Sequence, residues 1–253
     1  MRTILRWTMR LVLPLLVLLA GPAATVATGM ADVDQPWWQG RRGGSFGHAP
    51  TPEAHPDAVV QVYGARTRGW RGAFAVHTWL AMKPEGADAY TRYEVIGWRY
   101  FRGTSPLAEQ QTAQPDGWWF GSAPALLLDL RGGAAEAAIP RIREAVASYA
   151  YPDFYRTWPG PNSNTFTAHV GRSVPELGLD LPPTAIGKDF RLVPVDLSPS
   201  GGGLQFSILG ALGVLVSPEE GLEVNVLGLS LGIDPLEPAL RLPGLGLVWP
   251  GRE

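Results

Sequence analysis

Glycine and proline interrupt this chain at short intervals, and this feature restricts its fold more than any other. Together they supply 31 + 24 = 55 of the 253 residues, about 22%, against a usual total near 12%. Both residues break helices and favour turns. The pattern therefore favours strands, turns and loops over a helical bundle. The chain is still long enough to bury a sizeable core in one or two domains.

The first 31 residues form a different kind of segment. Three arginines at positions 2, 6 and 10 precede an apolar run, and the 21 residues from Leu11 through Ala31 carry no charge. A basic start, a short apolar stretch and small residues near Ala27 or Ala31 are typical of a secretory signal peptide, and 21 uncharged residues also just span a bilayer. We therefore predict a signal peptide or membrane anchor over residues 1–31. Both alternatives predict that the rest of the chain is exported. With an anchor it faces outward from the cytoplasmic membrane, and after cleavage of a signal peptide it is periplasmic or extracellular.

A proline- and glycine-rich linker is predicted over residues 32–57. Its tandem tryptophans, Trp37 and Trp38, either lie at a membrane interface or pack on the domain. An α+β core domain is predicted over residues 58–195. Four runs rich in β-branched and aromatic residues come first, VVQVYGAR, FAVHTWLAMK, YTRYEVIGWRYF and WWFGSAPALLLDL.

Helical spacing follows these runs. Ile139, Ile142, Val146 and Tyr149 recur every three or four residues, which predicts a helix near residues 138–151 with Pro140 in its first turn. A second helix is predicted over 162–172, with Asn162 as its N-cap. Because strands precede helices instead of alternating with them, the sequence predicts an antiparallel sheet with packed helices.

The tail, residues 196–253, is rich in glycine and leucine. Two apolar runs flank Ser217-Pro218-Glu219-Glu220, which predicts a β-hairpin, and a change in alternation predicts a bulge near Gly228. Both faces of this hairpin are partly apolar, so it either packs on the core or rests on lipid. Packing on the core is the favoured alternative.

Several kinds of chemistry lack support in the sequence. The chain has no cysteine, and its net charge of −2 with a pI near 6.1 argues against a nucleic-acid partner. The four histidines are scattered, so no metal site is predicted, and no motif predicts a cofactor. Gly228-Leu229-Ser230-Leu231-Gly232 matches a nucleophile elbow as a string, but no helix pattern and no histidine follow it. Ser230 is therefore interpreted as structural.

One segment places a hydroxyl where it could do chemistry. The run WPGPNSNTF brings Ser163 to the first turn of the predicted helix, where free N–H groups and the positive end of the helix dipole can stabilise an oxyanion. Simple capping by Asn162 or Ser163 explains the same residues.

His77 is the candidate base. It shares a strand face with Ala75 and Trp79, and Glu94 on the next strand candidate could orient its imidazole if the two strands pair. A hydrogen-bonded core histidine is the favoured alternative for His77. Lys188 could instead assist Ser163, although Asp189 beside it favours a solvated ion pair or surface turn.

These motifs carry a resemblance. VVQVYGARTRGWRGAFAVHTWLA, TRYEVIGW, WPGPNSNTF, LPPTAIGKDF and the glycine-rich tail resemble the bacterial family known as domain of unknown function 3750, over about residues 59–246. The order of histidine strand and helix-start N-S-N-T is also distantly similar to circularly permuted papain-like proteins of the lecithin retinol acyltransferase type, which act on amide or ester bonds. That resemblance implies His77 as base, Glu94 as orienting group and Ser163 as nucleophile. Serine stands here where those enzymes carry cysteine, and a hydroxyl needs stronger base assistance.

Two functions follow as hypotheses. The first is a serine-dependent hydrolase or acyltransferase of the cell envelope. The second is a non-catalytic binding or structural module of the same fold, which takes an envelope peptide, lipid or glycan and associates with the membrane through its N-terminus. The candidate binding residues are Asn162, Asn164, Thr165, Trp79, Trp98 and Lys188, with Trp118 and Trp119 as further aromatic candidates.

Overall fold

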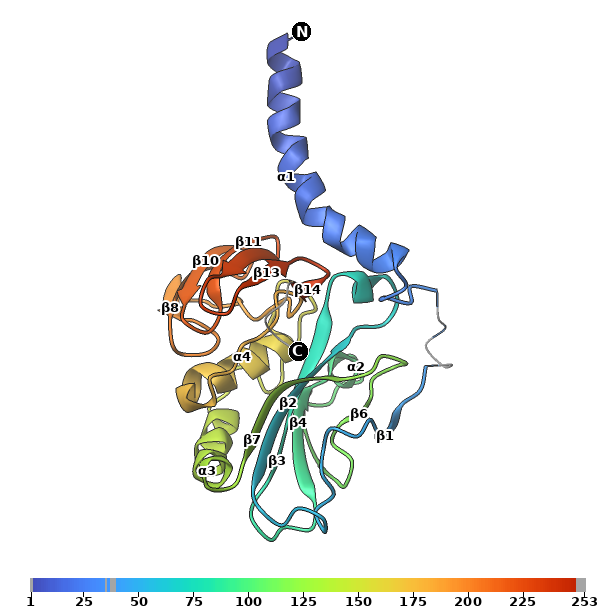
Figure 1. The fold of residues 1–253 in the computed structure, drawn as a ribbon, viewed down its shortest axis with the longest axis vertical. Coiled ribbons are helices and arrows are strands. Elements are labelled where there is room, and N and C mark those ends of the chain that lie inside the picture. Colours follow the sequence, from blue (N-terminus) through green and yellow to red (C-terminus); the bar gives the residue numbers. More distant parts are fainter. Residues whose placement is uncertain (1, 35, 37–39, 249–253) are drawn as a thin grey trace.

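The fold is that of a computed structural model, which describes residues 2–34, 36 and 40–248 (Figure 1). Trp37 and Trp38, for which an interfacial or packing role is predicted, lie outside the described residues. A five-stranded sheet forms the centre of the domain, in the order β5-β4-β3-β2-β7, with every neighbouring pair antiparallel. Its strands are β2 (Val59–Arg66), β3 (Val76–Lys83), β4 (Tyr90–Val95), β5 (Leu107–Thr112) and β7 (Ala125–Arg131).

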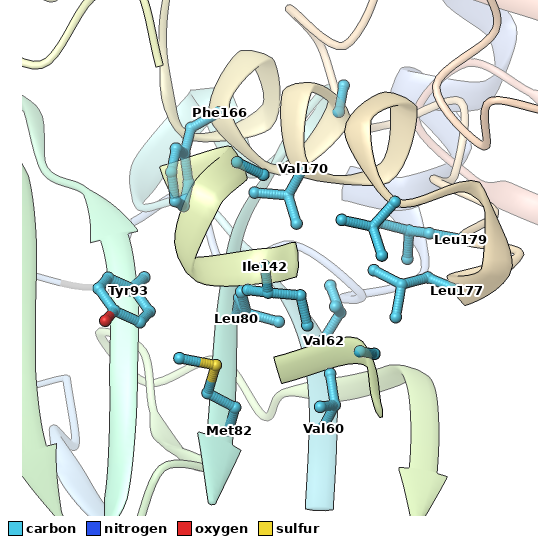
Figure 2. Packing of buried hydrophobic residues seen from close by; sticks show 14 of the residues in the cluster. Val60, Val62, Leu80, Met82, Tyr93, Ile142, Phe166, Val170, Leu177 and Leu179 are labelled. Carbon is cyan, nitrogen blue, oxygen red and sulfur yellow. The ribbon is translucent and has the colours of Figure 1, made fainter. Parts of the chain in front are cut away.

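Two helices, α3 (Gly133–Ala147) and α4 (Ser163–Ser173), cover one face of this sheet. Figure 2 shows the core between them, where strand side chains such as Val62 and Leu80 meet Ile142 of α3 and Phe166 of α4. All four are buried. Helices packed on an antiparallel sheet confirm the predicted α+β class.

Alternation along the strands separates the two faces of the sheet. Leu80 and Met82 belong to the helix-side core, whereas Trp79 and Ala81 belong to a second core on the opposite face. This is the period of two that strand geometry imposes. The second face is partly covered by a two-stranded sheet of β1 (Gly43–Ser45) and β6 (Gly117–Trp118), and by the segment that follows β6.

The structure corrects several predicted boundaries. The third strand run ends at Val95, and α2 (Gly97–Phe101) follows in place of continued strand. Helix α3 begins at Gly133, which places Pro140 inside the helix and not in its first turn. Helix α4 begins at Ser163 after the predicted Asn162 cap. Two short 3-10 helices, η1 (Gly69–Ala73) and η2 (Pro175–Leu177), occupy connections.

The tail forms a seven-stranded antiparallel meander in place of a single hairpin, in the order β14-β13-β12-β11-β10-β9-β8. The predicted hairpin is its centre, β10 paired with β11, and the predicted bulge near Gly228 is instead the turn between β11 and β12. The strands are β8 (Val195–Leu197), β9 (Leu204–Ile208), β10 (Leu212–Ser217), β11 (Gly221–Val226), β12 (Leu229–Asp234), β13 (Ala239–Leu242) and β14 (Gly246–Val248).

The two faces of this C-terminal sheet have opposite polarity. The inner face, toward the domain, carries buried polar residues such as Gln205, Glu223 and Arg241. The other face, which we call the outer face, carries exposed apolar residues. These are Val195, Leu197, Leu204, Phe206, Ile208, Leu212, Val214, Val216, Leu222, Val224, Leu231, Ile233, Leu240 and Val248. The expectation that the hairpin buries its apolar side chains against the core is therefore wrong for this face.

Helix α1 (Arg2–Ala27) projects from the domain beside the C-terminal sheet (Figure 1). Its C-terminal part meets the β13–β14 turn so closely that a Cβ on Gly21 would lie 2.0 Å from the Pro243 carbonyl oxygen. Leu13, Leu15 and Leu16 farther along the helix are exposed. In the part of the chain that the structure describes, no helix combines the length and apolar character needed to cross a membrane.

Candidate functional site

The structure brings His77 and Glu94 together as the sequence predicts. Strands β3 and β4 pair in antiparallel register, and His77 Nε2 lies 2.9 Å from Glu94 Oε2. Arg92 Nη2 donates to the same oxygen at 3.0 Å. His77 and Glu94 are buried, and the guanidinium of Arg92 lies 4.4 Å from the centroid of the Trp79 ring. The three side chains therefore form one buried polar cluster on the second face of the sheet.

The pKa directions define the charge state of this cluster. Burial lowers the pKa of His77, and the hydrogen bond and charge of Glu94 oppose this only in part. Burial alone would raise the pKa of Glu94, but the hydrogen bond from His77 and the charge of Arg92 hold it below its ordinary value. A neutral imidazole that donates its Nε2 proton to a carboxylate already paired with Arg92 fits both directions.

Aromatic rings enclose the imidazole. The Trp119 ring stacks on His77 with centroids 3.8 Å apart and planes 6° from parallel, and the Trp79 ring stacks at 5.8 Å from His77. Trp98 extends the stack beyond Trp119 and is 40% exposed. Trp79 is fully buried and donates Nε1–H to the Pro115 carbonyl, so it is a core residue and not one that can stack on a ligand.

The polar side chains at the start of α4 are engaged in holding the helix. Asn162 Oδ1 accepts from the backbone N–H groups of Asn164 and Thr165, and Thr165 Oγ1 accepts from Asn162 N–H, which makes a capping box. Asn164 Nδ2 donates to the carbonyls of Val76 and Ile186. These bonds confirm Asn162 as the N-cap. Those of Thr165 stabilise the first turn of the helix, and those of Asn164 hold it against neighbouring backbone.

The structure does not bring Ser163 and His77 together. Thr78, the residue after His77, hydrogen-bonds to Asn164 and Thr167 of α4, so it points to the helix face. His77 points to the opposite face, because successive strand residues alternate. No hydrogen bond joins the described side chains of His77 and Ser163. Two cavities of the domain, of about 540 Å³ and 160 Å³, are lined by neither residue.

Lys188 lies where the sequence did not place it. The prediction of a solvated ion pair or surface turn is wrong, because the Lys188 side chain is fully buried between the domain and the C-terminal sheet. Its Nζ lies 2.6 Å from Glu223 Oε2 and 3.4 Å from Asp189 Oδ1. Burial alone would lower the pKa of Lys188, but these carboxylates outweigh burial and raise it. A charged, paired lysine is a poor base for Ser163.

A cavity of about 540 Å³ lies at the C-terminal end of α1, and we call it the α1 cavity. Segments far apart in the sequence build it, so no local motif signals it. Arg66 lies on its wall and donates to the carbonyl oxygens of Gly72 and Gly244 at 2.8 and 3.0 Å. The residues that matter for its chemistry are Arg66, Arg68, Trp118, Ala125, Leu127 and Thr184.

These observations define an α+β domain with a buried polar cluster, a capped N-terminus of α4 and an open cavity. A family model described as protein of unknown function (DUF3750) matches residues 57–190, just over half of the chain. The chain therefore belongs to this family, which confirms the resemblance seen in its motifs. No curated protein matches the chain. No solved structure matches it either, and the papain-like resemblance stays a prediction.

Proposed function

We propose that this chain is a non-catalytic binding module of the cell envelope, exported and held at the membrane by α1. One observation carries the choice of binding over catalysis. His77 and the helix that begins at Ser163 lie on opposite faces of the same sheet. A general base must come within hydrogen-bond reach of the proton that it takes. His77 is instead bonded to Glu94 and stacked against Trp119.

The α1 cavity is the proposed ligand site. Its volume falls in the usual range for small-molecule pockets. Trp118 and Leu127 supply apolar surface, Arg66 and Arg68 supply two positive charges, and Asp32 supplies one negative charge. The hydrogen bonds that the structure describes for Arg66 go to carbonyl oxygens, which leave its charge available to a ligand. We therefore propose an anionic amphiphile as the ligand class, such as a lipid-derived phosphate.

The first experiment separates catalysis from binding. The full chain is treated with a serine-directed fluorophosphonate probe, beside its Ser163→Ala variant. We expect no labelling of Ser163 in the parent protein, because no hydrogen bond joins its hydroxyl to a base among the residues that the structure describes. Labelling of the parent that disappears in Ser163→Ala would establish the serine hydrolase or acyltransferase and overturn the proposal.

The second experiment tests the ligand site. Hexyl phosphate is titrated calorimetrically into the full chain in detergent, with hexanol as its uncharged counterpart. We expect the phosphate to bind more tightly, and Ala125→Trp to weaken it at least tenfold by filling the cavity from an exposed position. Ala137→Trp, on an exposed position of α3, is the matched control and leaves binding unchanged. Equal binding by the Ala125→Trp and Ala137→Trp variants contradicts this site.

A further inference from the structure

The outer face of the C-terminal sheet is the most unusual surface of the described molecule. Every side chain that its strands β8–β14 direct outward is aliphatic, phenylalanine or, at position 246, glycine. Seven strands at about 4.8 Å spacing, with up to six residues at about 3.4 Å each, give a planar footprint of order 500 Å². Contiguous exposed apolar patches of more than a few hundred Å² are rare on soluble monomers, and those that occur are often functional.

The inner face explains why the sheet cannot turn over. Glu223 meets Lys188 and Arg241, and Asn225 Nδ2 lies 2.6 Å from Asp189 Oδ2. A shift of one residue in register would place these polar side chains outward and the valines inward. The buried ion pairs therefore fix the apolar residues on the outside. The exposed apolar face is a consequence of the native pairing and not of a misplaced strand.

We infer that the outer face docks on the surface of a lipid bilayer. The composition of the face favours lipid over protein. Central parts of protein–protein interfaces are enriched in tyrosine, tryptophan, phenylalanine, methionine and arginine. Of these, the outward positions of the described strands hold only Phe206, and they hold no polar side-chain atom that would need a partner.

Continuity with α1 supplies a second argument. The β13–β14 turn packs against Gly21 and Pro22 of α1, and Arg66 Nη2 donates to the Gly244 carbonyl of that turn. The C-terminal sheet lies at the end of the molecule from which α1 extends (Figure 1). Because the proposed function holds α1 at a membrane, this packing brings the sheet to the same membrane. In this respect the inference rests on the tether of the proposed function, although not on the ligand cavity.

Trp158 marks the rim of the proposed contact. Its ring is 48% exposed, and its Nε1–H donates to the carbonyl of Leu227 at 3.0 Å, in the turn between β11 and β12. Leu227 is itself 60% exposed. Tryptophan is favoured at membrane interfaces, where its apolar ring and polar N–H meet different surroundings. The rim thus has the side chain expected where an apolar face meets the headgroup region.

The absence of cysteine makes a direct test possible, because one introduced thiol accepts one label. The environment-sensitive fluorophore NBD is attached to Val224→Cys in the centre of the outer face. Matched chains carry it at Leu16→Cys on α1 and at Ala137→Cys on exposed α3. Each full chain is reconstituted in vesicles of phosphatidylethanolamine and phosphatidylglycerol, with or without doxyl-labelled lipid.

We expect emission at residues 16 and 224 to shift to shorter wavelength and to be quenched by doxyl lipid, while residue 137 shows neither change. Val214→Asp, directly opposite Val224 in the β10–β11 pair, should abolish quenching at residue 224 only. It replaces an exposed side chain and should leave the circular dichroism unchanged.

Three outcomes contradict the inference. Water-like emission at residue 224 with quenching at residue 16 shows a tethered chain whose sheet does not touch lipid. A shorter-wavelength emission at residue 224 without lipid quenching shows that protein, such as a second copy, covers the face. Absence of quenching at both positions overturns the tether as well, and so separates failure of the proposed function from failure of the sheet contact alone.

Discussion

Glu223→Gln tests whether buried charges hold the C-terminal sheet on the domain. Glu223 accepts from Lys188 at 2.6 Å and also pairs with Arg241, and all three side chains are at most 2% exposed. Glutamine keeps the shape of the side chain but removes its charge. Two buried cations then share the two remaining carboxylates, Asp189 and Asp180.

The magnitude follows from the burial. Removing one partner of a buried ion pair costs about 3–5 kcal/mol, because the other charge stays buried without compensation. For a chain of this size each kcal/mol lowers Tm by about 2–4 °C, so we expect a loss of about 6–20 °C. The matched control is Glu176→Gln, whose pair with Arg141 is 40–49% exposed. Such surface pairs contribute about 0–1 kcal/mol, so its Tm should fall by at most about 4 °C.

Thermal unfolding followed by circular dichroism measures both variants, and Lys188→Met, alone and combined with Glu223→Gln, completes the experiment. Removing the cation as well should recover part of the lost Tm, because no buried ammonium group is then left without the Glu223 carboxylate, while Asp189 keeps its hydrogen bonds from Gln205 and Asn225. A Glu223→Gln loss no larger than that of Glu176→Gln would refute the reasoning. A loss of Tm in the double variant that exceeds the sum of the losses in the two single variants would also refute it.

Three further predictions concern the domain. Asn162→Ala removes an N-cap and the Nδ2 bonds to Thr157 and Ile186, so urea unfolding should show a loss of about 2 kcal/mol or more, against less than about 1 kcal/mol for Ser163→Ala. Equal losses would contradict the capping assignment. The folded pKa of His77 is lowered, so its contribution to stability is complete above the unfolded pKa of about 6.5 and is lost as pH falls toward the folded value. The stability difference between the parent and His77→Gln should therefore narrow from pH 7 to pH 5; a constant difference would exclude this titration. Gly187→Ala should destabilise by more than about 1 kcal/mol, since φ is +103° and a Cβ would lie 2.3 Å from Asn162 Nδ2. Gly133→Ala is the control, because a Cβ there meets nothing within 4 Å, and it should leave the midpoint of urea unfolding unchanged or raise it.

The features that depend on local physics could be predicted from the sequence. The period-two runs predict β2 over its full length, and the spacing of side chains places His77 and Glu94 on the same face of two neighbouring strands. The Asn162 cap was predictable because capping needs only a short side chain before a helical run. In each of these cases the partner of a residue lies within the same element or on the neighbouring strand.

The features that depend on partners elsewhere in the chain could not be predicted. Ser163 and His77 were linked by their order along the chain, but which sheet face α4 covers depends on how Thr78 and Asn164 meet in three dimensions. The adjacent Lys188 and Asp189 predict an exposed ion pair. Nothing near them in sequence indicates that Glu223, 35 residues later, binds Lys188 in the interior. The α1 cavity is lined by six separate stretches of the chain and leaves no local sequence pattern.

The C-terminal sheet shows why alternation alone does not reveal which face is buried. A period of two separates Val224 from Glu223 and Asn225, but it assigns neither face to the interior. The usual rule assigns the apolar face inward, because burial of apolar surface drives folding. Here the core segment presents Lys188, Asp189 and other charged groups to the sheet, and a polar face compensates them where an apolar face would leave them unpaired. The orientation of the sheet is therefore set by the charge of the surface beneath it. The apolar side chains consequently face outward, where we propose that lipid covers them.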